Sequence, residues 1–346
     1  MATQLYSTVA SRNLIRAEMT MLKMVENIQV IGLFGDQKQQ PQRKTDTCVF
    51  RRLKPFNATS AEVPNITSAN FITAEGTTPT ANTISYTDVT VTVEQYSVLF
   101  KFSSKSQLMY EDDIPGDMQT LTSKTLAEVA ELVAYGISKA GTSVIYANGS
   151  TQAGVNTKIS LRKLQLAARI MESNRATHIS TAIMPGPSFG TAPVEPAYLV
   201  LYHTDGSADV RKLEGFTKRV EYGSAIKPLH PREIGACEEF RFVPSPLFAP
   251  YLTSGSSTAN GMKTTSGSVD VYPFIVLAES ALGHISLKGT QDYSGISPTI
   301  IPSNVKNHAN PSGMFGYVGA DFWYACVRLN ENFMTRIECG VSELTS

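Results

Sequence analysis

A long polar segment followed directly by an overlong β pattern constrains the fold more than any other feature of this chain. Residues 56–82 are rich in Thr, Ser, Ala and Asn, and among their few apolar residues are Ile66 and Phe71. Such a segment cannot form a core of its own. From Ile84 to Phe102, apolar and polar residues alternate with phase slips that indicate β-bulges, over a length far beyond the usual strand of about five or six residues. We therefore expect one long strand and an arm that lack a partner within their own molecule and need a neighbouring subunit to cover them.

Helical periodicity is clearest in three places. Pro115, Gly116 and Asp117 form a helix-start signal, after which the chain places its large apolar residues on one broad face until Gly141. Those residues are Met118, Leu121, Leu126, Val129, Leu132, Val133 and Ile137. A second amphipathic helix is predicted from Ser160 to Asn174, and a third within the first thirty or so residues, where Leu14, Met19, Leu22, Val25 and Ile28 recur at helical spacing.

Short strand patterns dominate the second half of the chain. They are predicted at Tyr198–Tyr202, Arg241–Val243, Phe274–Leu277 and His284–Leu287. The span Thr253–Ser268 is almost entirely small and polar, which indicates a mobile surface loop. Residues 322–329 carry apolar groups on both faces and predict a buried strand, after which a turn at 330–332 leads into a returning strand at 333–337.

Charge and cysteine usage exclude several classes of protein. The chain has 30 Lys and Arg against 30 Asp and Glu, which argues against a protein whose main task is to grip nucleic acid. Its four cysteines are widely scattered, so neither a zinc site nor a disulfide framework is indicated, and reduced buried thiols are expected. No apolar run is long enough to span a membrane and no secretion signal begins the chain, so we expect folding in a cytoplasm.

Catalytic chemistry finds little support. His203, Asp205 and Ser207 could be read as part of a hydrolase site, but side chains so close in sequence seldom form a triad, and a solvated turn is the better interpretation. No nucleotide-binding motif and no helical pair of metal-binding histidines occurs. We predict no catalytic residue, no metal and no cofactor.

Several short motifs, taken in order along the chain, carry a resemblance to a known family. They are Ala74-Glu75-Gly76-Thr77-Thr78-Pro79, Glu94-Gln95-Tyr96-Ser97, Val271-Tyr272-Pro273, Arg328-Leu329-Asn330-Glu331 and Met334-Thr335-Arg336-Ile337-Glu338. With the order of predicted elements, they make the chain resemble major capsid proteins of tailed phages with the Hong Kong 97-like fold. The closer resemblance is to the coliphage N-four-type major capsid proteins.

The resemblance implies an α+β fold with an inserted domain. The implied parts are an N-terminal arm (1–44), an extended β-loop (45–105), a peripheral domain with a spine helix (106–157 and 271–346) and an axial domain (158–270). It also implies assembly of pentamers and hexamers into an icosahedral shell in a host bacterial cytoplasm, enclosing double-stranded DNA that it contacts non-specifically. Portal, scaffolding and decoration proteins are the further implied partners, and no membrane is involved.

The basic stretch from Lys38 to Lys54 has three interpretations: it faces packaged DNA, it pairs with carboxylates of a neighbouring subunit, or it is a solvated face. We favour the subunit contact, because the stretch flanks the loop expected to overlap a neighbour and Arg pairs well with carboxylates. The candidate inter-subunit contact residues are Arg51, Arg52, Phe71, Glu75 and Glu111.

The chain also departs from the wider fold class. Some members weld subunits covalently through a Lys on the extended loop, but no Lys occurs here between Lys54 and Lys101, so that crosslink is not expected. No long charged helical extension precedes the arm, so scaffolding is expected from a separate protein. Two alternatives remain open, namely an encapsulin-like shell of a bacterial nanocompartment and a soluble hydrolase that uses His203 and Asp205.

Overall fold

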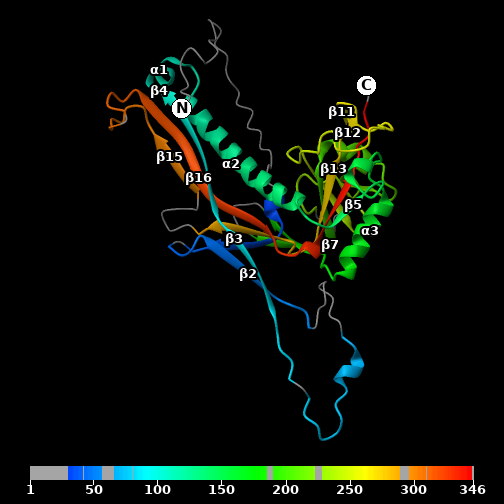
Figure 1. The fold of residues 1–346 in the computed structure, drawn as a ribbon. Helices are drawn as coiled ribbons and strands as arrows, with labels where there is room; N and C mark the ends of the chain where they lie inside the picture. Colours follow the sequence, from blue (N-terminus) through cyan, green and yellow to red (C-terminus); the bar gives the residue numbers. More distant parts are fainter. Residues whose placement is uncertain are drawn as a thin grey trace.

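Figure 1 shows an elongated molecule in which one long helix, α2 (Ile114–Lys139), runs between two regions of β-sheet, with a hairpin projecting away from both. This computed structural model describes residues 30–41, 43–56, 66–79, 81–184, 190–222, 228–288, 296–308 and 310–344. The amphipathic helix predicted around Leu14–Ile28 lies outside these residues. The mixture of helices and strands confirms the predicted α+β class.

The long strand β16 (Phe315–Arg328) is the central member of a five-stranded sheet. Three strands pair antiparallel with β16: β4 (Glu94–Ser103), β14 (Leu282–Leu287) and β15 (Ile296–Ile301). The fifth, β1 (Asp36–Gln40), adds parallel to the outer side of β14. The strand expected at residues 322–329 is therefore the second half of a longer central strand.

Helix α2 packs on this sheet through a face that matches the predicted one only in part. Its start at Ile114, with Pro115 in the first turn, agrees with the prediction. The predicted Met118 and Leu126 are buried. The other buried positions include the small or polar residues Thr122, Ala130, Glu131, Ala134 and Ser138. Leu121 and Leu132 are instead 51% and 46% exposed. Small side chains let the helix approach the sheet closely, so the prediction was wrong for Leu121 and Leu132 for a steric reason.

Two arginines hold the C-terminal end of α2, where helical carbonyl groups lack intrahelical donors. Arg328, at the end of β16, donates from Nη1 to the Ile137 carbonyl at 2.9 Å. Arg336 donates to the carbonyls of Lys139 and Gly141. Because Arg336 lies on β17 (Met334–Cys339) of the second sheet, these bonds tie the helix to both sheets.

The second sheet has eight strands and the largest core. Its main path is β5 (Val144–Tyr146), β17, β13 (Tyr272–Leu277), β7 (Gly190–His203), β10 (Phe240–Ser245), β9 (Gly235–Cys237) and β8 (Thr217–Lys218), and β6 (Ile179–Met184) pairs with β7. Helix α3 (Leu161–Ser173) covers it with Leu164, Ala167 and Met171, all fully buried. The predicted helix at 160–174 and the predicted strands at 198–202, 241–243, 274–277 and 284–287 are confirmed.

The returning strand predicted after the turn at 330–332 does form, but it does not return alongside its predecessor. The 3-10 helix η7 (Glu331–Phe333) follows β16, and β17 then joins β13 and β5 in the other sheet. Consecutive strands thus belong to different sheets. A pattern of apolar residues cannot reveal this, because it records which face is buried and not which partner covers it.

The overlong strand is also corrected by the structure. It is two strands, β3 (Tyr86–Thr92) and β4, which change partners at the buried Val93. β3 pairs with β2 (Thr47–Leu53) in a hairpin, and β4 pairs with β16 over ten positions. The expectation that this strand lacks a partner within its own molecule is wrong. Only the loop beyond the hairpin is left without one among the described residues.

The remaining elements are short. They are α1 (Ser104–Met109), α4 (Ser207–Val210), the two-stranded β11 (Thr264–Thr265) and β12 (Ser268–Val269), and the 3-10 helices η2 (Ile31–Leu33), η3 (Ser68–Phe71), η4 (Gln152–Gly154), η5 (Thr204–Gly206) and η6 (Arg219–Glu221). The predicted surface loop at 253–268 includes β11 and is bonded to its surroundings, since the Gly255 and Ser256 amides donate to the carbonyls of Val269 and Val155. It is a folded loop, attached at several points.

Candidate inter-subunit surface

The hairpin β2–β3 ends in a loop that extends away from the rest of the molecule (Figure 1). The last ladder bond joins the Lys54 amide to the Ser85 carbonyl at 2.9 Å. We name the described residues beyond it, 55–56, 66–79 and 81–84, the projecting loop. Every described residue from Ile66 to Tyr86 is exposed, including apolar side chains such as Ile72 at 80% and Ile84 at 72%. Exposed apolar residues concentrated on one loop indicate a contact surface.

The projecting loop has some order of its own. Phe56, which follows β2, and Phe71, in η3, meet edge to face with ring centroids 5.8 Å apart. A pocket of about 630 Å³ within the loop is lined by these rings and by residues that include Ile72, Pro79 and Asn82. Phe71 remains 51% exposed despite this contact. The predicted contact residue Phe71 is therefore held in place and still available to another surface.

Glu75 lies at a tight turn in the same loop. The Thr77 amide donates to the Ala74 carbonyl at 3.2 Å, and Gly76 at the third position of the turn has φ +81°, a conformation that favours glycine. The turn presents the exposed Glu75 side chain to solvent. This geometry accounts for the Glu75-Gly76 pair that the sequence places there.

Arg51 and Arg52 lie on β2, where alternate side chains face opposite ways. Arg51 donates from Nε and Nη2 to the two oxygens of Asp88, both at 2.8 Å, and lies over the Tyr86 ring at 5.6 Å. Hydrogen bonds from Arg51 lower the pKa of Asp88. The Arg51 guanidinium thus has a partner within the hairpin, directly across the β2–β3 register, whereas among three interpretations the sequence analysis favoured a partner on another subunit. Arg52 is half-buried.

Glu111 lies at the opposite end of the molecule from the projecting loop, between α1 and α2 (Figure 1). The five predicted contact residues are therefore not brought together within one chain. Beside Glu111 the structure places an apolar patch that the sequence did not reveal, with Leu108 80%, Met109 69% and Met314 55% exposed. The Ser104 amide donates to the Met314 carbonyl at 2.8 Å, which connects the segment of Met314 to the start of α1. The short apolar run Leu108-Met109 was its only signal in the sequence.

The predicted turn at His203–Ser207 holds an ion-pair network rather than a triad. Asp205 accepts from Lys263 Nζ at 2.7 Å and from the Tyr272 hydroxyl at 2.8 Å. Ser207 Oγ lies 3.4 Å from the Tyr202 hydroxyl and pairs with it, and not with His203. Burial lowers the pKa of His203, while the neighbouring Asp205 opposes this shift. The contacts crosslink the turn to β13 and to the loop before β11.

No group of His, Cys, Asp and Glu side chains able to hold a metal occurs within the described residues. All four cysteines are free and buried, as expected from their spacing. None of the helices in the described ranges is both long and apolar enough to cross a membrane.

Comparison with known proteins gives a match only at the level of structure. No family model and no curated protein matches the sequence. The capsid of Ralstonia phage GP4 matches with a TM-score of 0.62 and 10% identity, covering 97% of this chain and 100% of that chain. The head of Helicobacter pylori bacteriophage KHP40 matches with a TM-score of 0.57 and 9% identity, covering 90% of each chain. The SrpI encapsulin of Synechococcus elongatus PCC 7942 matches with a TM-score of 0.54 and 10% identity, covering 98% and 99%.

These likenesses extend over 90% and 97% of the chain and therefore span both sheets and the long helix. The fold predicted from the order of elements is confirmed: the chain has the Hong Kong 97-like fold shared by phage capsid chains.

Proposed function

We propose that this chain is the major capsid protein of a tailed bacteriophage, which assembles through pentamers and hexamers into an icosahedral shell around double-stranded DNA. Its role is structural and uses no catalytic residue or cofactor. The observation that carries the proposal is the projecting loop, which exposes apolar side chains that no other part of the described chain covers. Repeated copies arranged by closed symmetry can cover such a surface on every subunit at once.

The finer assignments belong to the same proposal. Within it, residues 1–44 are the N-terminal arm, 45–105 the extended loop, 106–157 and 271–346 the peripheral domain, and 158–270 the axial domain. The five-stranded sheet lies outside the inserted range and β7 to β10 lie within it, while β5, β13 and β17 of the same eight-stranded sheet come from the peripheral ranges. Membership of the coliphage N-four-type group, the portal, scaffolding and decoration partners, and assembly in a bacterial cytoplasm are proposed with it.

A second candidate is the shell of a bacterial nanocompartment, because an encapsulin chain matches at nearly full length. Electron microscopy of the expressed full chain tests both candidates. Closed icosahedral particles, or rings of five and six subunits, are expected, and a monodisperse monomer would defeat both. A terminase and portal encoded beside the gene would favour the phage shell, and a cargo enzyme captured in the particles would favour the nanocompartment.

We also propose that the basic strand β2 meets carboxylates of a neighbouring subunit, with Arg51 and Arg52 on its two faces paired with Glu75 or Glu111. Replacement of both arginines by glutamate should block formation of capsomers. Since Arg51 also binds Asp88 in its own hairpin, a matched control is needed. The exchange Arg51→Glu with Asp88→Arg keeps the hairpin pair and moves the positive charge to the partner strand.

The control separates the two roles of Arg51. If its only task is to stabilise the hairpin, the exchanged pair should assemble with normal yield while Arg51→Glu alone does not. If it contacts a neighbour, both variants should assemble poorly. Particles of normal yield and stability from the Arg51→Glu, Arg52→Glu variant would contradict the proposed subunit contact.

A further inference from the structure

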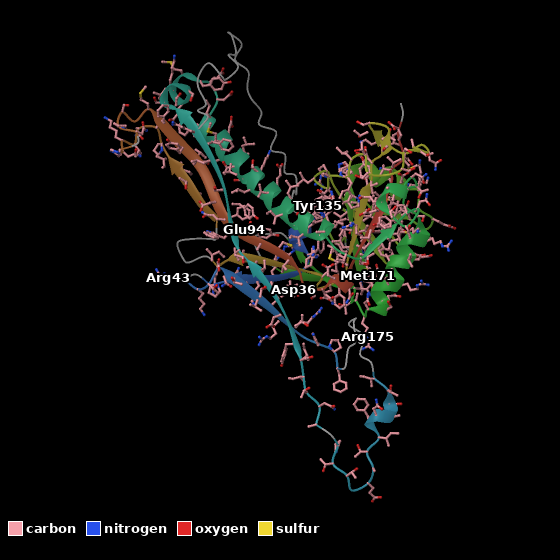
Figure 2. The ribbon with its side chains drawn as sticks, viewed as in Figure 1. Asp36, Arg43, Glu94, Tyr135, Met171 and Arg175 are labelled. Atoms are coloured by element: carbon pink, nitrogen blue, oxygen red, sulfur yellow. The ribbon has the colours of Figure 1, made fainter. Side chains whose placement is uncertain are left out.

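The first described residues, 30–34, are buried between α2 and strands of both sheets. We name them the anchor segment. Val30 and Ile31 are fully buried and Phe34 is 5% exposed. They belong to the core cluster of Ala134 and Tyr135, at the end of α2 where Figure 2 shows Tyr135 close to the eight-stranded sheet. The chain then continues from Asp36 as β1.

Two titratable side chains from other elements hold the backbone of the anchor segment. The amides of Val30 and Ile31 both donate to Oε2 of Glu131 at 3.1 Å, and the Ile31 amide is also 3.1 Å from Oε1. On the other side of the segment, the Phe34 carbonyl lies 2.8 Å from Nε2 of His284. Nδ1 of His284 lies 2.7 Å from the Tyr324 hydroxyl. A neutral imidazole that donates from Nε2 and accepts at Nδ1 satisfies both contacts.

Glu131 is an unusual residue for this position because it is 1% exposed in the middle of the packed face of α2. Among the described residues it forms no ion pair. The charged and titratable groups that act on it or pack around it are Arg232 before β9, Tyr324 and Cys326 on β16, and His284 on β14. Burying a carboxylate with so little positive charge nearby disfavours its ionised form.

The pKa of Glu131 reflects this balance. Burial raises the pKa to about 7, against the lowering effects of the backbone amides of the anchor segment and of Arg232. The amides of Val30, Ile31 and Gly32 favour the ionised form of the carboxyl, and burial outweighs them. Oε2 accepts from both the Val30 and the Ile31 amide, and the Ile31 amide is shared with Oε1. A proton can reside on Oε1 while Oε2 keeps both bonds.

We propose that Glu131 is a proton-linked anchor: the segment 30–34 packs onto α2 with uptake of one proton by the Glu131 carboxyl, and is held more tightly in mildly acidic than in mildly alkaline solution. When the segment detaches, water reaches the carboxyl and its pKa falls back toward its ordinary range. The docked form then binds more protons between the two pKa values. The stabilisation is complete below the ordinary pKa and is lost as pH rises through about 7.

His284 acts in the opposite direction. Burial lowers its pKa, so its contribution is present above the ordinary pKa of histidine and is lost as pH falls. The wild-type pH dependence is the sum of both groups, and a variant is needed to separate them. The contacts lie within one chain, so the inference can be tested whether or not particles form.

Hydrogen exchange of the full chain, measured from pH 5 to pH 8 on peptides that cover 30–34, tests the proposal. Protection factors of wild type are divided by those of Glu131→Gln, an isosteric variant that cannot ionise. This ratio should fall by up to about tenfold per pH unit as pH approaches 7 and level off above it. Glu128→Gln, on the same helix, is the matched control and should leave the wild-type pH dependence unchanged.

Peptides from β13 report whether each variant is folded. A ratio that does not change with pH would overturn the proposal. So would an anchor segment that is unprotected at every pH in Glu131→Gln while β13 stays protected, because the ionised carboxylate would then be the form that binds. His284→Gln removes the opposing contribution of the histidine. In this variant, protection of residues 30–34 should fall with rising pH already in the lower part of the range from pH 5 to pH 8.

Discussion

The eight-stranded sheet and the projecting loop are built from similar apolar residues and reach opposite outcomes. In the sheet, Phe274 is 1% exposed and stacks on Tyr202 with ring centroids 5.0 Å apart. In the loop, Phe71 meets Phe56 at 5.8 Å and is 51% exposed. The same kind of aromatic pair thus completes a core in one region and leaves a surface in the other. The difference teaches that the first region is stabilised within the chain, whereas the second has its apolar surface free for a partner.

The largest expected effect follows from breaking the core pair. Phe274→Ala should destabilise the chain by about 3–5 kcal/mol, because it removes a buried ring and leaves a cavity. Denaturant unfolding followed by circular dichroism measures the change. An unfolding free energy within about 1 kcal/mol of wild type would show that this sheet is not the main source of stability.

The matched change in the loop should act on assembly and not on folding. Phe71→Ala removes an exposed aromatic contact worth about 0.5–1.5 kcal/mol at most, so the midpoint of unfolding should move little. Particle yield, measured by sedimentation, should fall strongly. Normal particles from this variant would remove the loop from the proposed contact, and a large loss of folding stability would erase the contrast between the two regions.

A smaller effect concerns local opening of the hairpin and of the eight-stranded sheet. Cys48 lies in β2, in a small cluster with Val93, Ile285 and Ala325, whereas Cys339 is fully buried in the large sheet core. Burial also raises the pKa of the Cys339 thiol well above its ordinary value. In native protein at pH 8, a thiol reagent should therefore label Cys48 first, as mapped by mass spectrometry. Labelling of Cys339 before Cys48 would mean that the sheet opens more readily than the hairpin.

Local signals explain why much of the fold could be predicted. Pro115 and Gly116 mark the start of α2, and Ser160 and Asn174 lie at the two ends of α3. The alternation from Ile84 to Phe102 correctly indicated β-structure. Its division at Val93 was missed because a change of strand partner leaves the alternation almost intact.

The candidate surface was less predictable. Arg51, Arg52 and Glu75 stand out as charges beside a polar segment, but Asp88 gave no sign that it would pair with Arg51 across the hairpin. Leu108 and Met109 carried no prediction from the sequence, and only the fold shows that nothing in the described chain covers them. Exposure of an apolar residue is a property of its surroundings, and these come from residues distant in the sequence.

The sequence by itself determined the kinds and order of the elements, because capping residues, glycine and proline positions and apolar periodicity act over a few neighbouring residues. Only the tertiary structure decided that β16 and β17 belong to different sheets, and that α2 packs through Thr122, Ala130 and Glu131 while Leu121 and Leu132 face outward. The physical reason is that strand partners and buried faces are selected by steric fit between distant segments. That fit also placed a carboxylate inside the packed face of a helix, where no pattern of hydrophobicity would put one.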